Sequence, residues 1–304
     1  MGLYIRYLVE RTMMLFLVVI AALSINFVIP RLSPGDPIEV VLARMRDRGE
    51  MVGGREIVME YKRMFGLDQD IATQFFSYIR EVLKGNLGYS ISYFPAKVTD
   101  IIMPALPWTI FLLGFSVMTS WLLGTTIGGI VGWRGQDSKI GRILTPITLI
   151  LNTIPYYMLA LILVFLLAYT LQIFPLSGGY SIGATPTLSL DFILDVLRHS
   201  ILPMLSIVLA GMGWWFLSMR AMVTTVKGAD FILMAEAKGL TKYRIMWKHA
   251  FRNALIPQVT GLAMSLGHIV GGAILTETMF SYPGIGFNLY GAISSADYPV
   301  IQGI

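Results

Sequence analysis

Long apolar runs separated by polar segments repeat along the whole chain, and they predict a bundle of membrane-spanning helices. A helix rises about 1.5 Å per residue, so about 20 apolar residues cross a hydrocarbon core of about 30 Å. Five segments are long and apolar enough to do so, at residues 12–30, 105–132, 146–171, 201–219 and 258–280. We therefore expect an all-α fold, a polytopic membrane helix bundle, in which residues 1–304 form a single transmembrane domain.

The polar segment at residues 31–104 follows the first apolar run and is patterned as short helices. Asp70 precedes a run of apolar residues at helical spacing, from Ile71 to Leu83, and Gly85 follows that run. Aspartate favours the N-cap of a helix, and glycine favours the position just after its C-terminal end. The pattern predicts a small helical segment outside the bilayer.

The basic residues of the short connecting segments predict the orientation of the chain. Segments 133–145 and 220–257 carry three and seven Lys or Arg residues, whereas 172–200 holds only Arg198 and 281–304 holds none. Short basic loops stay in the cytoplasm, and long segments cross the membrane regardless of charge. We therefore expect the N-terminus and 220–257 to be cytoplasmic and 31–104 to be outside. The first apolar run is too long for a signal peptide, so we interpret it as an uncleaved span.

Small residues and one proline mark how the spans pack. Gly124, Gly128 and Gly132 recur every fourth residue, as do Gly267 and Gly271, and such spacing lets helix backbones approach closely. The pattern leaves open whether they pack within this chain, against a partner subunit or along a pathway. Pro155 lies inside the third apolar run, where it removes a helical hydrogen bond, so we expect a kink there.

Composition agrees with a membrane protein and removes several kinds of chemistry. The chain is 55% hydrophobic and 13% charged, where soluble domains are about a quarter charged. It has no cysteine, so disulfides and thiolate chemistry are excluded. The net charge of +5 comes from residues that flank the apolar runs and indicates membrane orientation rather than nucleic-acid binding.

Catalytic patterns are weak in this sequence. Gly179–Gly183 reads G-x-S-x-G around Ser181, with Asp195 and His199 downstream, so a membrane-embedded serine hydrolase is one alternative. The stretch lies in a Gly/Pro/Ser/Thr loop between two spans, without the strand that such enzymes need, and we favour a flexible outer loop. With three histidines, no H-E-x-x-H and no phosphate-binding G-x-x-x-x-G-K-[ST], we predict neither a metal site nor an ATP site in this chain.

An ion-coupled secondary transporter is the second alternative. Such proteins place ionisable residues within the membrane despite the cost of burying them. The predicted spans hold one candidate acid, Glu277, near the outer end of the fifth. It either contacts substrate or serves as a hydrogen-bonded structural acid, and we favour the structural role.

The segment 220–257 is an amphipathic helix pair divided by Gly239. Asp230–Lys238 predicts a short helix, and a glycine at the bend accepts dihedrals that other residues resist. The second helix has one apolar face and one basic face. The apolar face holds Leu240, Tyr243, Trp247, Ala250, Phe251 and Ala254, and the opposite face holds Lys242, Lys248, His249 and Arg252. Spacing alone leaves two roles open, binding to the anionic inner leaflet or docking of a soluble partner.

This segment resembles the cytoplasmic EAA-type loop of binding-protein-dependent ABC importer permeases, in the variant of the dipeptide/oligopeptide/nickel family. The similarity covers nearly the whole chain, with motifs in the same order as in the family. The matching stretches are Arg31–Pro37, Gly66–Asp68, Gly85–Ser90, Ala235, Ala237–Leu240, His249–Ala250, Arg252–Ala254, Ile256–Pro257, Gly271–Glu277, Phe280–Gly286 and Asp297–Pro299. Two features differ: Leu233 stands where the general motif has a glutamate, and a sixth span is expected beyond Ile304.

The resemblance implies one permease subunit with the type I ABC importer fold, in a multi-pass arrangement in the prokaryotic cell (inner) membrane. Its partners would be a homologous second permease subunit, two cytoplasmic ATP-binding subunits and an extracytoplasmic substrate-binding protein. The chain would form half of the translocation pathway and couple it to the ATPase. It would have no catalytic residue and no cofactor of its own, since ATP and Mg²⁺ would be bound by the ATP-binding subunits.

The resemblance also implies site residues and a substrate class. The coupling residues would be Ala235, Glu236, Ala237, Lys238, Gly239, Leu240, Arg252 and Asn253. Candidates for the pathway are Asn152, Pro155, Tyr156, Trp214 and Glu277. The substrate would be an oligopeptide or an oligosaccharide, because Gly178–Ser181 and Met234–Ala237 resemble sugar-importing branches, and aromatic rings stack on sugars.

Overall fold

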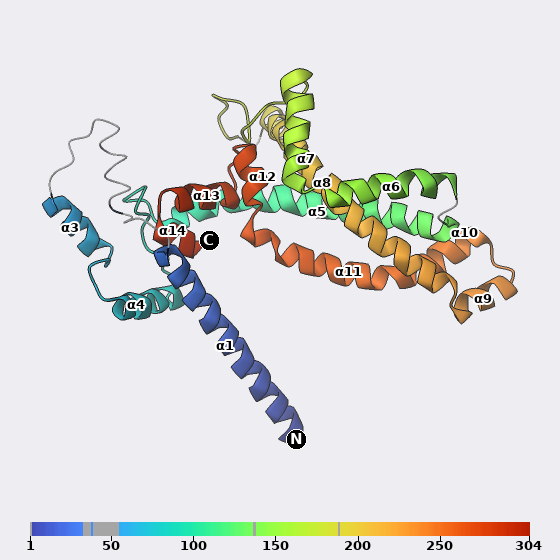
Figure 1. Ribbon diagram of the computed structural model, residues 1–304, viewed down its shortest axis with the longest axis horizontal. Helices are drawn as coiled ribbons and strands as arrows, with labels where there is room; N and C mark the ends of the chain where they lie inside the picture. The colour runs from blue at the N-terminus through green and yellow to red at the C-terminus, as the bar shows by residue number, and fades with distance from the viewer. Residues whose placement is uncertain (1, 33–37, 39–54, 136–137, 188) are drawn as a thin grey trace. The chain divides into compact units, whose positions relative to one another are not determined.

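The structure is a computed structural model that describes residues 2–32, 38, 55–135, 138–187 and 189–304 (Figure 1). Within these ranges the regular elements are helices, apart from one isolated antiparallel bridge between Tyr89 and Lys97. Most of the motif Arg31–Pro37 lies outside the described residues. The chain divides into two compact units, Met1–Pro104 with Asn288–Ile304, and Ala105–Phe287.

The first unit contains the first predicted span and the small helices that follow it. Helix α1 (Gly2–Leu32) confirms that span, and almost all of its apolar surface is exposed. The other elements of the unit are α3 (Arg55–Met64), α4 (Ile71–Leu83), the first turns of α5 (Val98–Arg134), most of α13 (Ile285–Ser294) and α14 (Tyr298–Gly303).

The predicted ends of α4 are confirmed. The Asp70 carboxylate accepts a hydrogen bond from the Thr73 backbone N–H at 3.0 Å, which satisfies one of the donors left free at a helix start. Gly85 follows the last turn with φ +74°, a conformation that side chains with a Cβ resist. The short helix is therefore fixed by its own sequence.

A buried carboxylate joins the last helix of the first unit to the loop before α5. Asp297 precedes α14 and accepts hydrogen bonds from the Ser90 hydroxyl at 2.5 Å and from the backbone N–H groups of Ile91 and Ser92 at 3.1 and 3.0 Å. Two of the family motifs, Gly85–Ser90 and Asp297–Pro299, thus meet at one hydrogen-bonded site.

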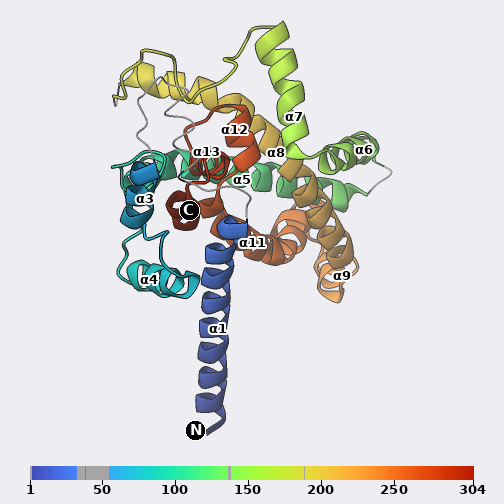
Figure 2. The same ribbon diagram turned by 60° about the vertical axis from the view of Figure 1, so that its left-hand side comes forward.

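The second unit contains the remaining long helices (Figure 2). Its elements are the rest of α5, α6 (Lys139–Thr153), α7 (Tyr156–Leu163), η1 (Val164–Thr170), α8 (Leu190–Lys227), α9 (Asp230–Ala237), α10 (Lys242–Ile245), η2 (Met246–Phe251), α11 (Arg252–Gly267), η3 (Ile269–Gly271) and α12 (Ile274–Met279). Helices α5 and α8 confirm the second and fourth predicted spans. Both are longer than predicted, and α8 begins at Leu190 because Ser189 caps it, accepting from the Phe192 N–H at 3.3 Å.

The third predicted span, 146–171, is broken rather than continuous. Helix α6 ends at Thr153, α7 begins at Tyr156, and the two segments are bent by 101°. Pro155 lacks the N–H that would continue the helix and forces Ile154 into extended backbone, with φ −80° and ψ 122°. The kink expected at Pro155 is confirmed and is much sharper than a bend within one helix.

The fifth predicted span, 258–280, is wrong as a single helix. Helix α11 ends at Gly267, and Gly272 has φ +74°, which stops the chain from continuing as a right-handed helix before the short α12. By length and apolar character, three of the described helices are able to span a membrane, or four when the bent pair counts as one span.

The glycine repeat of α5 packs within the chain. A Cβ added at Gly124 would lie 2.6 Å from the Trp215 Cβ, and one at Gly132 would lie 2.7 Å from the Arg220 carbonyl oxygen, both on α8. At Gly128 it would overlap the Phe216 carbonyl group. The three glycines therefore allow α5 and α8 to touch backbone to backbone. Among the described residues, no atom lies within 4 Å of a Cβ added at Gly267 or Gly271.

Candidate functional site

Helix α9 is a short helix that packs against the ends of longer helices. Its buried residues, Ile232 and Ala235, form one cluster with Ile245 of α10 and Ala250 of η2. Trp133 of α5 and Val226 of α8 pack against the same cluster, together with Leu240. Burial of these side chains fixes the inner side of α9 to the rest of the second unit.

Gly239 ends α9 in a specific hydrogen-bonded turn. Its φ is +72°, its N–H donates to the Glu236 carbonyl at 2.9 Å, and the Leu240 N–H donates to the Ala235 carbonyl at 3.3 Å. This pair of bonds, with a glycine in the left-handed region, is the Schellman motif of helix C-termini. The predicted helix Asp230–Lys238 and the bend at Gly239 are thus confirmed to within one residue.

The apolar face predicted for the second helix is partly wrong. Tyr243 is 74% exposed, whereas Ile245, which the pattern omitted, is fully buried. Thr241 starts a new helix, and the π-helical turn η2 follows, so the inward positions Ile245 and Ala250 lie five residues apart instead of three or four. On the predicted basic face, Lys242, Lys248 and Arg252 are exposed and His249 is half-buried.

The outer side of α9 exposes apolar side chains next to basic ones. Phe231, Leu233 and Met234 are exposed, Met234 by 61%. Glu236, Ala237 and Lys238 are exposed as well, while Leu240 is half-buried and Ala235 is buried. We call Phe231, Met234 and Lys238, which share one side at helical spacing, the outer face of α9. Sequence reasoning missed Phe231 and Met234, although their spacing from the buried Ile232 and Ala235 signals an outward direction.

The other two predicted coupling residues lie at the start of α11. Arg252 and Asn253 are exposed, and the Asn253 amide donates to the His249 carbonyl at 2.7 Å. They belong to α11, which continues from η2, and η2 holds Ala250, one of the residues that pack against the buried side of α9. Arg252 and Asn253 therefore lie close in sequence to that cluster but are not part of the outer face of α9.

The anchor of α9 continues into a second buried cluster that joins three long helices. Met219 and Val223 of α8 pack with Ala254 of α11, and Trp133 of α5 contacts both clusters. The Lys227 ammonium donates to the Trp133 carbonyl at 2.9 Å and lies 5.4 Å from the centre of its ring. The two clusters therefore connect α9 to the ends of α5, α8 and α11.

The pathway candidates fall into three places. Asn152 of α6 packs against Gly213 of α8, whose added Cβ would lie 2.7 Å from the Asn152 Cβ. Trp214 is next to that contact and is 53% exposed, while Trp215 is buried. Pro155 and Tyr156 lie at the 101° bend between α6 and α7.

Glu277 is fully buried and hydrogen-bonded on both carboxylate oxygens. Oε1 accepts from the Thr109 hydroxyl at 2.9 Å, and Oε2 accepts from the N–H groups of Gly286 and Phe287 at 2.6 and 3.1 Å. A Cβ at Gly284 would overlap this carboxylate. The geometry gives Glu277 a structural role, and the motif Phe280–Gly286 has glycines where a Cβ would meet its carboxylate. Both carboxylate oxygens are occupied by hydrogen bonds within the chain, unlike those of an ion relay.

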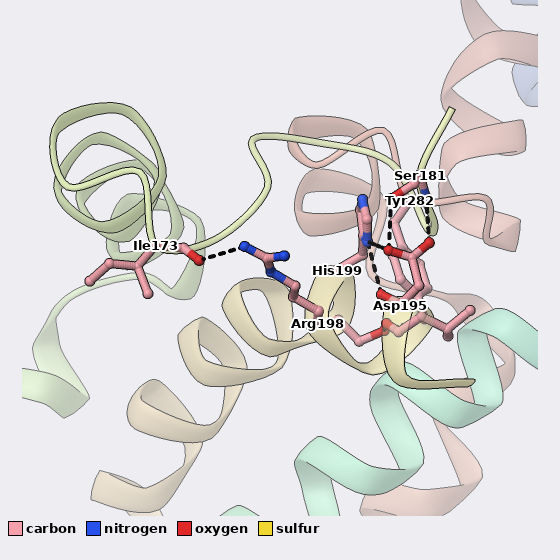
Figure 3. Close-up of polar contacts among 8 residues, drawn as sticks. Ile173, Ser181, Asp195, Arg198, His199 and Tyr282 are labelled. Atoms are coloured by element: carbon pink, nitrogen blue, oxygen red, sulfur yellow. Dashed lines mark hydrogen bonds and ion pairs between the residues drawn. The ribbon is translucent and has the colours of Figure 1, made fainter. Parts of the chain in front are cut away.

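The loop around Ser181 lacks the geometry of a catalytic triad (Figure 3). The Ser181 hydroxyl donates directly to Asp195 Oδ1 at 2.7 Å, and the Ser181 N–H donates to Oδ2 at 2.6 Å. His199 Nδ1 faces the Asp195 carbonyl at 2.9 Å and Oδ1 at 3.3 Å. In a triad the histidine lies between acid and serine, whereas here the carboxylate lies between serine and histidine. The contacts instead fix the loop to the first turns of α8.

Metal-ligand clusters are absent from the part of the chain that the structure describes, where no group of three or more His, Asp or Glu residues gathers. The site with the most distinctive surface is α9, because it alone among the predicted site residues combines a buried anchor with an exposed apolar and basic face.

Comparison with known proteins places the chain in a family. Residues 124–304 match the family model described as binding-protein-dependent transport system inner membrane component. A putative peptide permease protein of Brucella suis is 30% identical over 301 residues, covering 98% of this chain and 90% of the relative. The oligopeptide transport system permease protein of Bacillus subtilis is 29% identical, covering 97% and 90%, and the glutathione transport system permease protein of Salmonella choleraesuis is 29% identical, covering 98% and 90%. The expected resemblance is confirmed, and the chain belongs to the family of binding-protein-dependent transport system inner membrane components.

Proposed function

We propose that this membrane permease forms half of the translocation pathway of an ATP-driven importer and that α9 transmits the action of a separate ATPase to it. The partners would be a second, homologous permease subunit, two cytoplasmic ATP-binding subunits and an extracytoplasmic substrate-binding protein. ATP and Mg²⁺ would be bound by the ATP-binding subunits. The N-terminus and the segment that contains α9 would lie in the cytoplasm.

One observation carries this proposal: α9 is anchored on its inner side and open on its outer side. Ile232 and Ala235 are buried among residues of α5, α8 and α10, while Phe231 and Met234 are exposed. An apolar helix face with the exposed Lys238 at its end fits an apolar groove with an acidic rim on a soluble partner. A helix that only lay on lipid would not need to be packed against the ends of two long helices.

Short peptides are the proposed substrates. The relatives named above are described as permeases for peptides, oligopeptides and glutathione, and they align over nearly the whole chain. The exposed Trp214 and the bend at Tyr156 offer rings that would suit an oligosaccharide equally well, so these side chains do not discriminate between the two.

The coupling step would follow from the anchor. Closure of the ATP-binding subunits would displace α9, and the two buried clusters would carry the displacement to α5, α8 and α11. The bundle would then change between inward-open and outward-open states, which differ in how α9 contacts the ATPase.

Single-cysteine photo-crosslinking tests the docking surface, because the natural chain has no cysteine to interfere. Met234→Cys, labelled with benzophenone maleimide in the co-expressed transport system, should crosslink to an ATP-binding subunit. Ile182→Cys, in the exposed outer loop, should label equally well but give no such product. Equal crosslinking from both positions, or none from Met234→Cys, would contradict the proposal.

A further inference from the structure

The first unit contains a cavity of about 780 Å³ that the proposed coupling does not use. It lies between the end of α1, the residues before α4, one side of α4, the loop before α5 and α14. Its volume is within the range of about 300–1,000 Å³ that small-molecule sites occupy.

An arginine with unused donors lines this cavity. The Arg31 Nε and Nη2 donate to Gln74 Oε1 at 3.2 and 3.0 Å, and Nη1 donates to the Phe27 carbonyl at 2.9 Å. The guanidinium also lies 3.5 Å from the centre of the Phe27 ring, so it is held in one place. An arginine has five N–H groups, so one N–H on each terminal nitrogen is left without an acceptor among the residues that the structure describes. No carboxylate among the described residues forms an ion pair with it.

A second unused donor lines the same cavity. The Gln302 Nε2 is buried and has no hydrogen-bond partner among the described residues, although leaving a buried amide unpaired is unfavourable. The backbone of α14 is fixed at this point, because the Gln302 carbonyl accepts from the Asn26 amide at 2.9 Å. A buried donor that its own chain leaves unsatisfied indicates a missing acceptor.

The rest of the wall is mixed: apolar side chains form more of it than polar ones, and Arg63 and Glu81 line it as well. The Glu81 carboxylate accepts from the Lys84 ammonium at 2.6 Å and from the Asn86 amide at 2.8 Å. Side chains on several elements contribute to it, and the cavity-facing set includes Phe65, Leu67, Val82, Leu87, Ile91 and Phe94. Aromatic and aliphatic walls with a few fixed polar groups bind a molecule that has an apolar body and one polar end.

We propose that this cavity binds the carboxylate of a small apolar acid, with Arg31 and Gln302 holding the carboxylate and the apolar walls holding the body. The two remaining terminal N–H groups match the two oxygens of a carboxylate, and the amide supplies a further donor. A short peptide with a free C-terminus and a simple aryl acid both have this chemistry. The site is distinct from the coupling surface, and its occupancy is measurable without transport.

Ligand binding to the purified full chain in detergent micelles tests the proposal by ¹⁹F NMR. The probes are Leu-(4-fluoro)Phe with a free carboxylate, its C-terminal amide, and 3-(4-fluorophenyl)propanoate, each corrected for binding to empty micelles. The free acid peptide should bind roughly tenfold or more tightly than the amide, because the charge-assisted hydrogen bonds need the carboxylate. Tight binding of the propanoate would identify any apolar acid as the source, and weak binding would identify the peptide.

Two variants separate the carboxylate contact from folding. Arg31→Gln should remove the preference for acid over amide, and Gln302→Glu should remove it too, because a second carboxylate would occupy the fork while Arg31 stays in place. Arg80→Gln, which changes an exposed arginine of α4 away from the cavity, should leave the preference unchanged. Equal binding of acid and amide to the natural chain, or a preference that persists in either Arg31→Gln or Gln302→Glu, would overturn the proposal.

Discussion

Replacing Gly239 tests whether the turn after α9 sets the coupling geometry. An added Cβ would meet no atom of the described residues within 4 Å, so we attribute any effect to the backbone and not to a clash. The φ of +72° costs a residue with a Cβ about 1–2 kcal/mol, with valine at the upper end because it is β-branched. This is roughly a 5- to 30-fold shift against the observed turn.

The loss would act on the anchor of α9 directly. If the turn opens, the Gly239 and Leu240 N–H groups lose their bonds to the Glu236 and Ala235 carbonyls, and Leu240 leaves its buried cluster. We expect Gly239→Val to lower peptide uptake by cells that express the whole transport system about tenfold, while ATP hydrolysis in isolated membranes continues. The amount of inserted protein should stay the same, because the turn lies outside the spanning helices.

Two controls distinguish backbone strain from side-chain effects. Gly239→Asn should retain most of the uptake, since asparagine tolerates the left-handed region better than other residues. Gly228→Ala changes a glycine with φ −86° at the end of α8 and should have no effect. Normal uptake by Gly239→Val would refute the coupling role, and equal losses in the Val and Asn variants would refute the reasoning from φ.

Three further predictions concern stability. Gly128→Ala should force α5 away from the Phe216 carbonyl and cost about 1–3 kcal/mol in detergent unfolding, whereas Gly114→Ala, on the same helix with open space around it, should cost nothing. Glu277→Gln places an amide NH₂ against the N–H of Gly286 or the Thr109 hydroxyl and should lower the free energy of unfolding by about 1–3 kcal/mol. Thr109→Val removes only one of the partners of Glu277 and should lower the melting temperature less than Glu277→Gln does. The hydrogen bonds from the Thr73 hydroxyl and N–H lower the pKa of Asp70. The protection of the first turn of α4 from hydrogen exchange should therefore be complete above about pH 4 and fall as the pH drops through the lowered pKa. In Asp70→Asn this protection should not depend on pH.

Local signals in the sequence were sufficient for the elements that depend on near neighbours. The cap of α4 at Asp70, the helix Asp230–Ala237 and the turn at Gly239 each depend on residues within one helical turn. The close contact of α5 with α8 was also signalled, since three glycines at one spacing have few other uses.

The pattern of apolar residues predicted the wrong structure where a helix is interrupted within an apolar run. The run 258–280 is predominantly apolar, but Gly272 breaks the helix, and a count of apolar residues takes no account of φ. The break also depends on Glu277, whose partners Thr109 and Gly286 lie 168 and 9 positions away. Contacts at such separations leave no periodic trace in a single sequence.

The register of the second helix in the coupling segment failed for a related reason. A pattern of 3.6 residues per turn assigns Tyr243 to the buried side, but the wide turn at Met246–Phe251 moves the inward position to Ile245. The residues of that turn do not indicate in the sequence that it is a π-helical turn, which is wider than an α-helical one. The cavity beside Arg31 escaped sequence reasoning as well, because its walls come from five separate segments.

The length of α8 sets the scale of any movement that begins at α9. Its 38 residues make a rod about 57 Å long, so a tilt of about 5° about one end displaces the other by about 5 Å. The far end of that rod carries Asp195, which binds Ser181 through both its hydroxyl and its N–H. A rotation of this size about the end of α8 next to α9 would therefore move the loop around Ser181 by more than the diameter of a water molecule.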